Sequence, residues 1–217
     1  MTHKISTLLF DLDGTLIDTN ELIIQSFLHT LEKYYPSQYK REDVIHFMGP
    51  PLEETFSKVD SKRMELLRQT YLDFNRSQHD HYVKEFAGVY EAIEKLHKAG
   101  YKMGIVTTKR NEIAQMGLRL MGLTPFFETV VAFDHVTKVK PDPEGVNKAL
   151  AFFGSTPDEA IMIGDNYHDI EAGKNAGMKT AGVAWSLKGK EFLQRWSPDY
   201  MLETMDDLLD ILGVIQG

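Results

Sequence analysis

Short apolar runs recur along the chain, and each is bounded by polar residues or by glycine. Strands of a parallel sheet have this character, because both faces of such a sheet are covered. The runs span residues 7–10, 103–106, 129–132, 161–164 and 180–184. Segments with helical periodicity, residues 90–99, 112–121 and 144–153, lie between the later runs and end at or just before a glycine. This alternation predicts an α/β fold with a parallel sheet joined by right-handed crossovers.

The alternation is interrupted between residues 15 and 81, where helical periodicities follow one another without an intervening strand. Two apolar helical faces are Leu22, Ile23, Phe27, Leu31 and Tyr34, and Met64, Leu67, Tyr71 and Phe74. We therefore expect a helical insert over residues 16–81, with the core formed by residues 1–15 and 82–217. Because the insert follows the first strand directly, we expect it over the carboxyl end of that strand, where open α/β sheets bind ligands.

Charge and cysteine content exclude several classes of protein. The chain has 24 Lys and Arg against 32 Asp and Glu, a net charge of −8, which repels nucleic acid backbones and anionic lipids. It has no cysteine, so disulfides, thiolate zinc sites and cysteine nucleophiles are excluded. No signal peptide pattern is present, and no run approaches the roughly 18 apolar residues that cross a bilayer. We expect a cytoplasmic protein with a small anionic substrate and no nucleic acid, membrane or obligate protein partner.

Acidic residues follow two of the predicted strands. Asp11 and Asp13 follow the first, and alternate residues of an extended chain share a face, so both carboxylates are expected at one site. Carboxylates so close repel each other unless a cation lies between them. Asp165 and Asp169 follow the fourth strand, one turn apart if a helix starts there. Four carboxylates without cysteine or a compact histidine cluster predict a site for Mg²⁺ rather than for zinc.

Hydroxyl and ammonium groups follow other predicted strands. Thr107 and Thr108 end the second strand, where hydroxyls and free backbone N–H groups are suited to phosphate oxygens. The same pattern, taken alone, also occurs where a threonine caps a helix. Lys140 immediately precedes the stiff turn Pro141-Asp142-Pro143, which favours a positioned lysine over a solvated one.

Taken together, these segments resemble the four motifs of the haloacid dehalogenase superfamily, in family order and over the whole chain. The motifs are Phe10-Asp11-Leu12-Asp13-Gly14-Thr15, the apolar run into Thr107, Lys140-Pro141-Asp142-Pro143 and Gly164-Asp165-x-x-x-Asp169. The insert resembles the small helical cap of the phosphoglycolate phosphatase-like subclass. The amino-acid sequences of residues 15–23 and 104–109 are similar to those of the inorganic pyrophosphatase branch of this subclass. The resemblance implies a Rossmann-like core that carries a small inserted cap.

The resemblance also implies roles for individual residues. Asp11 would be the nucleophile and Asp13 the general acid and base. Thr107 and Lys140 would bind the transferring phosphoryl group. The resemblance further implies a bound Mg²⁺ ion. Its expected ligands are the Asp11 carboxylate, the backbone carbonyl of Asp13 and Asp165, with Asp169 hydrogen-bonded behind these ligands.

The expected function is therefore that of a Mg²⁺-dependent phosphohydrolase that acts through an aspartyl phosphate, with inorganic pyrophosphate as the substrate. Two alternatives remain open at this point. One is a phosphatase for small phosphomonoesters of the phosphoglycolate type, because the sequence does not show which residues of the insert face the cleft. The other is a catalytically silent binding module of the same fold, although such a module has no need for mutually repelling carboxylates. A dehalogenase is not expected, because the resemblance implies that dehalogenating members lack the acid corresponding to Asp13.

Overall fold

The computed structural model describes residues 4–214 and divides into two compact units. One unit comprises Met1–Asp18 and Lys84–Gly217, and the other comprises Thr19–Val83. The unit boundaries thus fall two or three residues later than the predicted boundaries at 15/16 and 81/82. The reason is a two-stranded antiparallel pairing of β2 (Ile17–Asp18) with β3 (Lys84–Glu85), which joins both connecting segments to the larger unit.

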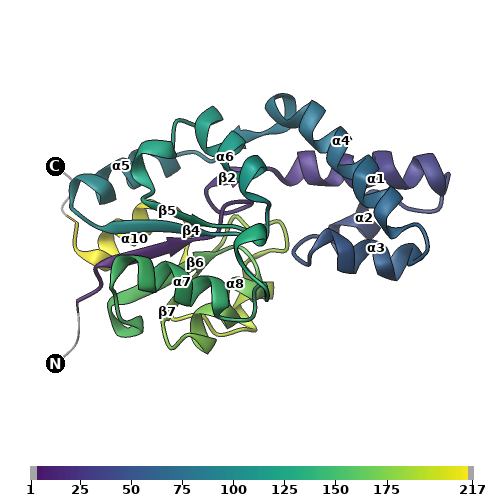
Figure 1. The fold of residues 1–217 in the computed structure, drawn as a ribbon. Helices are drawn as coiled ribbons and strands as arrows, with labels where there is room; N and C mark the ends of the chain where they lie inside the picture. The colour runs from purple at the N-terminus through teal and green to yellow at the C-terminus, as the bar shows by residue number, and fades with distance from the viewer. Residues whose placement is uncertain (1–3, 215–217) are drawn as a thin grey trace. The chain divides into compact units, whose positions relative to one another are not determined.

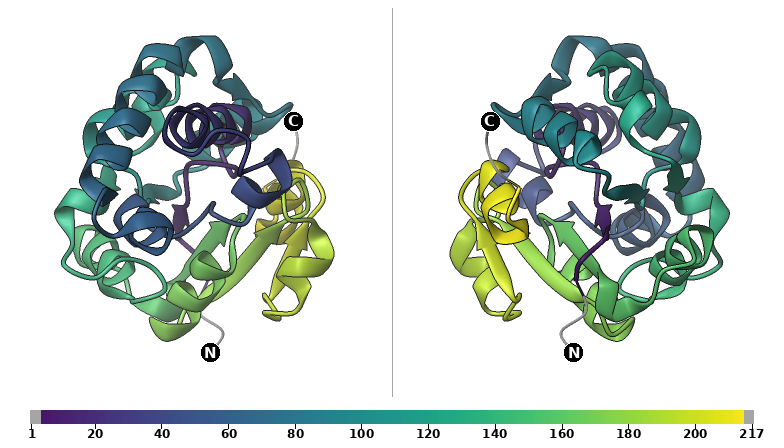
Figure 2. Two further views of the ribbon diagram at one scale, coloured as in Figure 1. Left: turned by 90° about the vertical axis from the view of Figure 1, so that its right-hand side faces the viewer. Right: turned by 90° about the vertical axis from the view of Figure 1, so that its left-hand side faces the viewer.

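The larger unit is built on a six-stranded parallel sheet with the order β5-β4-β1-β6-β7-β8 (Figure 1). The strands are β1 (Thr7–Phe10), β4 (Lys102–Val106), β5 (Thr129–Val131), β6 (Ala160–Gly164), β7 (Lys179–Val183) and β8 (Tyr200–Leu202). This confirms the predicted fold class, and five of the strands match the five apolar runs. The strand at the edge, β8, was not predicted; its segment appears in yellow-green at the sheet edge in Figure 2.

The strand order indicates which end of the sheet is suited to bind a ligand. From β1 the chain continues through β4 and β5 on one side of the sheet, and then through β6, β7 and β8 on the other. Ligands of open α/β sheets bind at the carboxyl ends of the strands where the order reverses in this way. The residues after β1, β4 and β6 are therefore brought together although they lie far apart in the sequence.

Helices cover both faces of the sheet, and this explains why its strands are apolar throughout (Figure 1). The larger unit contains α5 (Val89–Lys98), α6 (Asn111–Leu120), α7 (Glu144–Phe153), α8 (Tyr167–Asn175), α9 (Lys190–Gln194) and α10 (Asp206–Leu212). Leu8, Leu9 and Phe10 of the central strand are completely buried. Val146 and Leu150 of α7 pack into the same hydrophobic cluster as Leu9.

The smaller unit consists of α1 (Asn20–Tyr34), α2 (Arg41–Ile45), α3 (Leu52–Asp60) and α4 (Met64–Tyr82). Its core is aromatic, with the ring centroid of Phe27 at 4.8 Å from that of Tyr71 and 5.5 Å from that of Phe56. A buried polar contact also joins α1 to α4, where the Asn75 amide donates to Ser26 Oγ at 3.1 Å. Residues 19–83 are all described, and none of them lies in a strand.

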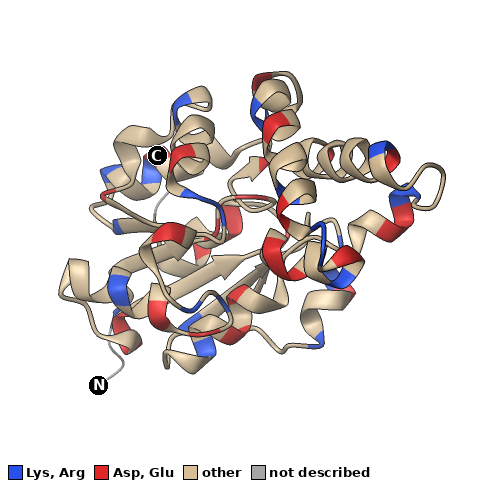
Figure 3. Ribbon diagram, turned by 45° about the vertical axis from the view of Figure 1, so that its right-hand side comes forward, with Lys and Arg blue, Asp and Glu red and all other residues tan. Residues whose placement is uncertain are grey.

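Across the described part of the chain, no helix has both the length and the apolar composition that a membrane span requires. Acidic and basic residues are intermixed over the helices and connecting loops (Figure 3). The distribution of charge over the backbone therefore does not mark a site by itself; the contacts of particular side chains do.

Candidate active site

Three carboxylates meet at the carboxyl ends of β1 and β6. Asp11 directly follows β1, and its backbone N–H donates to the carbonyl of Ile163 in β6 at 2.8 Å. Asp165 directly follows β6, and Asp169 lies in the first turn of α8. One carboxylate oxygen from each of these three residues lies within 4.8 Å of the other two. The parallel pairing of β1 with β6 is what brings these acids together from opposite ends of the sequence.

The helix after β6 begins too late for Asp165 and Asp169 to lie one turn apart on it. It starts at Tyr167, so Asp165 lies in the loop before the helix, and only Asp169 is helical. Asn166 caps the helix, and its N–H donates to Asp169 Oδ2 at 3.0 Å. The two acids therefore converge because the loop folds back toward the first turn, not because they are one turn apart on a helix.

Asp11 and Asp169 are buried and Asp165 is half-buried, and burial makes the negative charge of the acidic cluster costly. Burial raises the pKa of Asp11 to about 7; the Lys140 ammonium opposes this shift, and the Asp169 and Asp13 carboxylates add to it. Burial, followed by Asp11 and Asp169, also raises the pKa of Asp165 well above its ordinary value. Carboxylates that are held together away from water fit a bound cation, and their oxygen atoms are the ligands that Mg²⁺ prefers. The residues present thus fit a hard metal ion.

The raised pKa of Asp11 predicts how the stability of the metal-free protein depends on pH. Between the ordinary pKa of 3.8 and about 7, folded Asp11 holds a proton that the unfolded chain has released. The free energy of unfolding is therefore expected to fall as the pH rises through this window. Urea unfolding in EDTA at several pH values measures the slope, and Asp11→Asn is expected to make it shallower. A slope unchanged in the variant would contradict this assignment.

Lys140 connects the acidic cluster to a third strand. Its ammonium donates to Asp11 Oδ1 at 2.7 Å, to Asp169 Oδ1 at 2.5 Å and to the carbonyl of Val106, at the end of β4, at 2.7 Å. The side chain is only 4% exposed. Burial lowers the pKa of Lys140, but Asp11 and Asp169 outweigh burial and raise this pKa above its ordinary value. An ammonium has three protons, and here three acceptors receive them, so Lys140 is a fixed positive charge beside Asp11.

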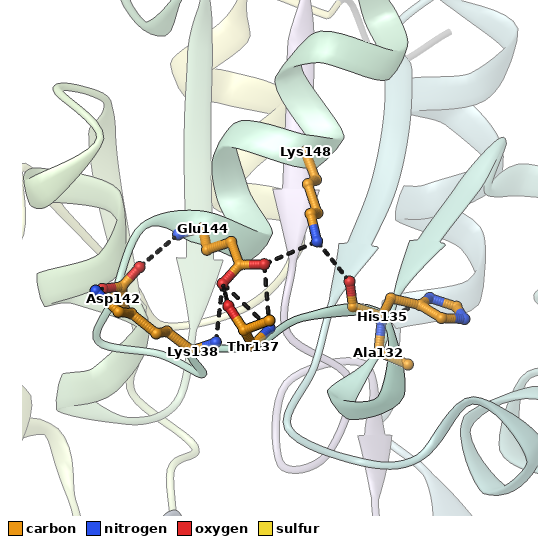
Figure 4. A network of polar contacts seen from close by, with 7 residues as sticks. All are labelled: Ala132, His135, Thr137, Lys138, Asp142, Glu144 and Lys148. Atoms are coloured by element: carbon orange, nitrogen blue, oxygen red, sulfur yellow. Dashed lines mark hydrogen bonds and ion pairs between the residues drawn. The ribbon is translucent and has the colours of Figure 1, made fainter.

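The loop that carries Lys140 is fastened to α7 by a network of polar contacts (Figure 4). Glu144, the first residue of α7, accepts hydrogen bonds from the backbone N–H of Thr137 at 3.1 Å and from that of Lys138 at 2.8 Å. Its carboxylate also accepts from Lys148 at 2.8 Å. Lys148 first, and then these donors of the loop, lower the pKa of Glu144 to about 2. The carboxylate thus holds the backbone two residues before Lys140.

Replacing Glu144 with glutamine is expected to lower kcat/KM about 10-fold, because a loosened loop misplaces the Lys140 ammonium. Steady-state kinetics on the purified protein provides the measurement. Lys148→Met serves as the matched control, since it removes the ion pair with Glu144 and an exposed hydrogen bond to the carbonyl of His135 but leaves the contacts of Glu144 with Thr137 and Lys138; we expect a change below about 2-fold. Equal losses in the two variants would show that the loop contacts are not what matters.

Thr107 and Asp13 meet through Lys109. The N–H of Lys109 donates to Thr107 Oγ1 at 3.1 Å, and its ammonium donates to Asp13 Oδ1 at 2.5 Å. The Asp13 carboxylate is near enough to Asp11 to contribute to the raised pKa of Asp11. In the part of the chain that the structure describes, Thr108 is half-buried and makes none of the hydrogen bonds that join these residues. The structure thus brings Thr107 and Asp13 together through Lys109 and leaves Thr108 outside these contacts.

The turn after Asp13 depends on a glycine. Gly14 has φ +77°, which side chains rarely adopt, and a Cβ atom at this position would lie 2.5 Å from Asp165 Oδ2. The missing side chain leaves the room in which Asp165 reaches the other acids. The carbonyl of Asp165 is itself held by Ser186, whose hydroxyl donates to it at 2.8 Å.

The sequence pattern predicted the acids and Lys140, but not the contacts made by Lys109, Ser186 and Glu144. Lys109 directly follows Thr107 and Thr108 in the segment 104–109. Its place beside these threonines was the sequence signal that could have indicated a role in the site. Ser186 and Glu144 had no comparable signal, because a serine in a loop and a glutamate at a helix start are common at surfaces.

Comparison with known proteins agrees with this geometry. Residues 8–183 match the model of the haloacid dehalogenase-like hydrolase family. Pyrophosphatase PpaX from Bacillus cereus is 57% identical over 210 residues, 97% of each chain, and that from Bacillus velezensis is 57% identical over 215 residues, 99% of this chain and all of the relative.

The fold is shared with a solved haloacid dehalogenase-like family hydrolase from Streptococcus pneumoniae. The TM-score is 0.86 at 24% identity, over 95% of this chain and 98% of the other. At this identity the likeness concerns the fold alone. The family model, by contrast, covers most of the chain and includes the acids after β1 and β6. The chain therefore belongs to the haloacid dehalogenase-like hydrolase family.

Proposed function

We propose that this protein hydrolyses inorganic pyrophosphate to two molecules of orthophosphate, through a phosphoryl group transferred to Asp11. The observation that carries the proposal is the surroundings of Asp11. Its carboxylate receives a hydrogen bond from the buried ammonium of Lys140 and lies beside Asp165 and Asp169 in a group that fits a metal ion. A carboxylate attacks an anionic phosphoryl group only where positive charge offsets their repulsion, and the Lys140 ammonium and a metal ion held by these acids would supply it.

Bonds and protons balance in two steps. In the first, an oxygen of Asp11 forms a bond to one phosphorus, and the bond from that phosphorus to the bridging oxygen breaks, leaving its electron pair on the departing orthophosphate. In the second, water attacks the aspartyl phosphate, releases the second orthophosphate and restores the Asp11 carboxylate. Asp13 is assigned to donate a proton to the leaving oxygen and to accept one from the water.

Other residues bind and orient. Lys140 and the Thr107 hydroxyl, with Thr108 as a further donor, are assigned to the transferring phosphoryl group. We assign Asp11, Asp165 and the backbone carbonyl of Asp13 to Mg²⁺, which supplies charge neutralisation at the phosphoryl oxygens when bound. Asp169 is assigned to orient Lys140. One of its carboxylate oxygens accepts a hydrogen bond from Lys140, and the other accepts one from the backbone N–H of Asn166.

Pyrophosphate is favoured over other phosphate compounds because the named relatives are pyrophosphatases and match nearly the whole chain at 57% identity. We further propose that the helical unit, Thr19–Val83, is a cap that admits substrate, since it is inserted directly after the strand that carries Asp11. The cytoplasmic location expected from the sequence stays a prediction.

The deciding experiment measures orthophosphate release in the presence of Mg²⁺ near neutral pH. Pyrophosphate is compared with phosphoglycolate and with a set of sugar and nucleotide monophosphates, and Asp11→Asn serves as the blank. We expect kcat/KM for pyrophosphate to exceed that for every monoester, and EDTA to abolish turnover. A preference for one monoester would retain the mechanism and overturn the substrate. The absence of turnover with every compound would favour a silent binding module.

A further inference from the structure

We propose that Lys109 determines the substrate class of this site by binding the phosphate that leaves. The site would then favour small phosphoanhydrides, in which the leaving group is itself an anionic phosphate, over phosphate esters of neutral alcohols. This inference rests on the proposed function, because it takes Asp11 as the nucleophile and Asp13 as the group that faces the leaving oxygen.

The position of the Lys109 ammonium supports this role. Its Nζ lies 2.5 Å from Asp13 Oδ1, so a leaving oxygen within reach of Asp13 is also near Lys109. Lys140 contacts different acids, with its Nζ on Asp11 and Asp169. The two lysines thus contact different carboxylates. One is beside the nucleophile that accepts the phosphoryl group, and the other is beside the acid assigned to the leaving group.

Lys109 is also partly shielded from water, unlike lysines that form ordinary surface ion pairs. Its side chain is 13% exposed and that of Asp13 is 17% exposed. The lysine side chains in the surface pairs of Lys58, Lys98 and Lys138 are 71%, 68% and 72% exposed. Charges interact more strongly where water is partly excluded, so an ammonium at this position contributes more to binding an anion than a surface lysine does. The remaining exposure leaves access for a small substrate.

The backbone of Lys109 is fixed on both sides. Its N–H donates to Thr107 Oγ1 at 3.1 Å, and its carbonyl accepts from the N–H of Phe133 at 2.9 Å. The first contact uses a lone pair of the Thr107 hydroxyl and leaves its proton available to a phosphoryl oxygen. A side chain that extends from a fixed backbone keeps its place when substrate binds, which lowers the entropic cost of the contact.

The charge of the leaving group explains why this contact selects between substrates. When the bridging P–O bond of pyrophosphate breaks, its electron pair stays on an orthophosphate that remains anionic, and an ammonium stabilises that charge as it develops. An alkoxide leaving from a phosphate ester takes a proton from Asp13 and departs as a neutral alcohol. The Lys109 ammonium then has no developing negative charge to stabilise.

The test compares Lys109→Met with the wild-type protein and with Lys98→Met, an exposed lysine of α5 that pairs with Glu94. We expect Lys109→Met to lower kcat/KM for pyrophosphate about 30-fold and that for glycerol phosphate less than about 3-fold. Lys109→Arg, which keeps the charge, is expected to recover part of the loss, and Lys98→Met to change neither value.

A binding measurement keeps the inference testable if turnover of esters is too slow. Calorimetric titration with Mg²⁺ present compares methylenediphosphonate, which has two phosphonate groups, with methylphosphonate, which has one. We expect Lys109→Met to weaken only the first, about 30-fold. Equal losses for both ligands, or no loss for either, would overturn the inference. If the wild-type protein does not hydrolyse pyrophosphate, the proposed function fails, and the two phosphonates still decide the role of Lys109.

Discussion

Replacing Asp11 with asparagine is expected to lower kcat for pyrophosphate by at least about 10⁴-fold, because an amide does not form the phosphoryl bond on which both steps depend. The substitution keeps the size of the side chain and an oxygen that accepts from the Lys140 ammonium, which lies 2.7 Å from Asp11 Oδ1. The contact with Lys140 is therefore retained, whereas the nucleophile and one anionic ligand assigned to Mg²⁺ are lost.

Two measurements check this result. Orthophosphate release under single-turnover conditions gives the rate of the first step. Acid quenching of the wild-type protein with labelled pyrophosphate traps a covalently bound phosphoryl group, which is expected to be absent in Asp11→Asn. Asp210→Asn, at an exposed position of α10, controls for the loss of one negative charge. Retention of a few per cent of wild-type activity in contamination-free Asp11→Asn would show that another group attacks the phosphorus.

Replacing Lys140 with methionine is expected to lower kcat/KM by about 10³-fold, at the upper end of the 10²- to 10³-fold loss that removal of one preorganised donor causes in an active site. The ammonium is nearly inaccessible to water and contacts both Asp11 and Asp169. Without it, two buried carboxylates face each other with no lysine between them. The pKa of Asp11 is then expected to rise further, because Lys140 is the main influence that lowers it.

The stability of Lys140→Met separates misfolding from a chemical defect. Removing one partner of a buried ion pair costs about 3–5 kcal/mol when the other charge stays ionised, and less when it takes up a proton. We therefore expect a modest loss of Tm at pH 5 and a larger loss at pH 8. Lys98→Met is the control for a lysine that is exposed. Activity within 10-fold of the wild type in a folded Lys140→Met protein would contradict the role assigned to this lysine.

Local sequence pattern was sufficient to predict the main features of the fold. A buried strand of a parallel sheet needs apolar residues on both faces, so five of the six strands of the sheet could be read as apolar runs. The edge strand β8 (Tyr200–Leu202) was missed because its tyrosine is exposed and its methionine is half-buried, so it is not a fully buried apolar run. The sequence left open whether the helix after β6 begins before or after Asp165, because the capping position of Asn166 depends on the fold of the loop.

The acids of the site were equally accessible from sequence, because each follows an apolar strand and the carboxyl ends of parallel strands meet at one edge. Asp11, Asp13, Asp165 and Asp169 were all predicted in this way. The contacts between them were not. Asp11 and Lys140 are 129 residues apart, and Asp13 and Lys109 are 96 apart. Such pairs depend on which strands lie side by side.

The sequence by itself thus determined the kinds of groups in this protein, through the local requirements of strands, turns and phosphoryl chemistry. Only the tertiary structure decided their partners. The strand order β4-β1-β6 places Lys140 between Asp11 and Asp169, and it places Lys109 on Asp13. Burial is the physical reason why this matters. Burial in this sheet raises the pKa of Asp11 to about 7, whereas hydrogen bonds from its neighbours lower the pKa of Glu144, outside the acidic cluster, to about 2.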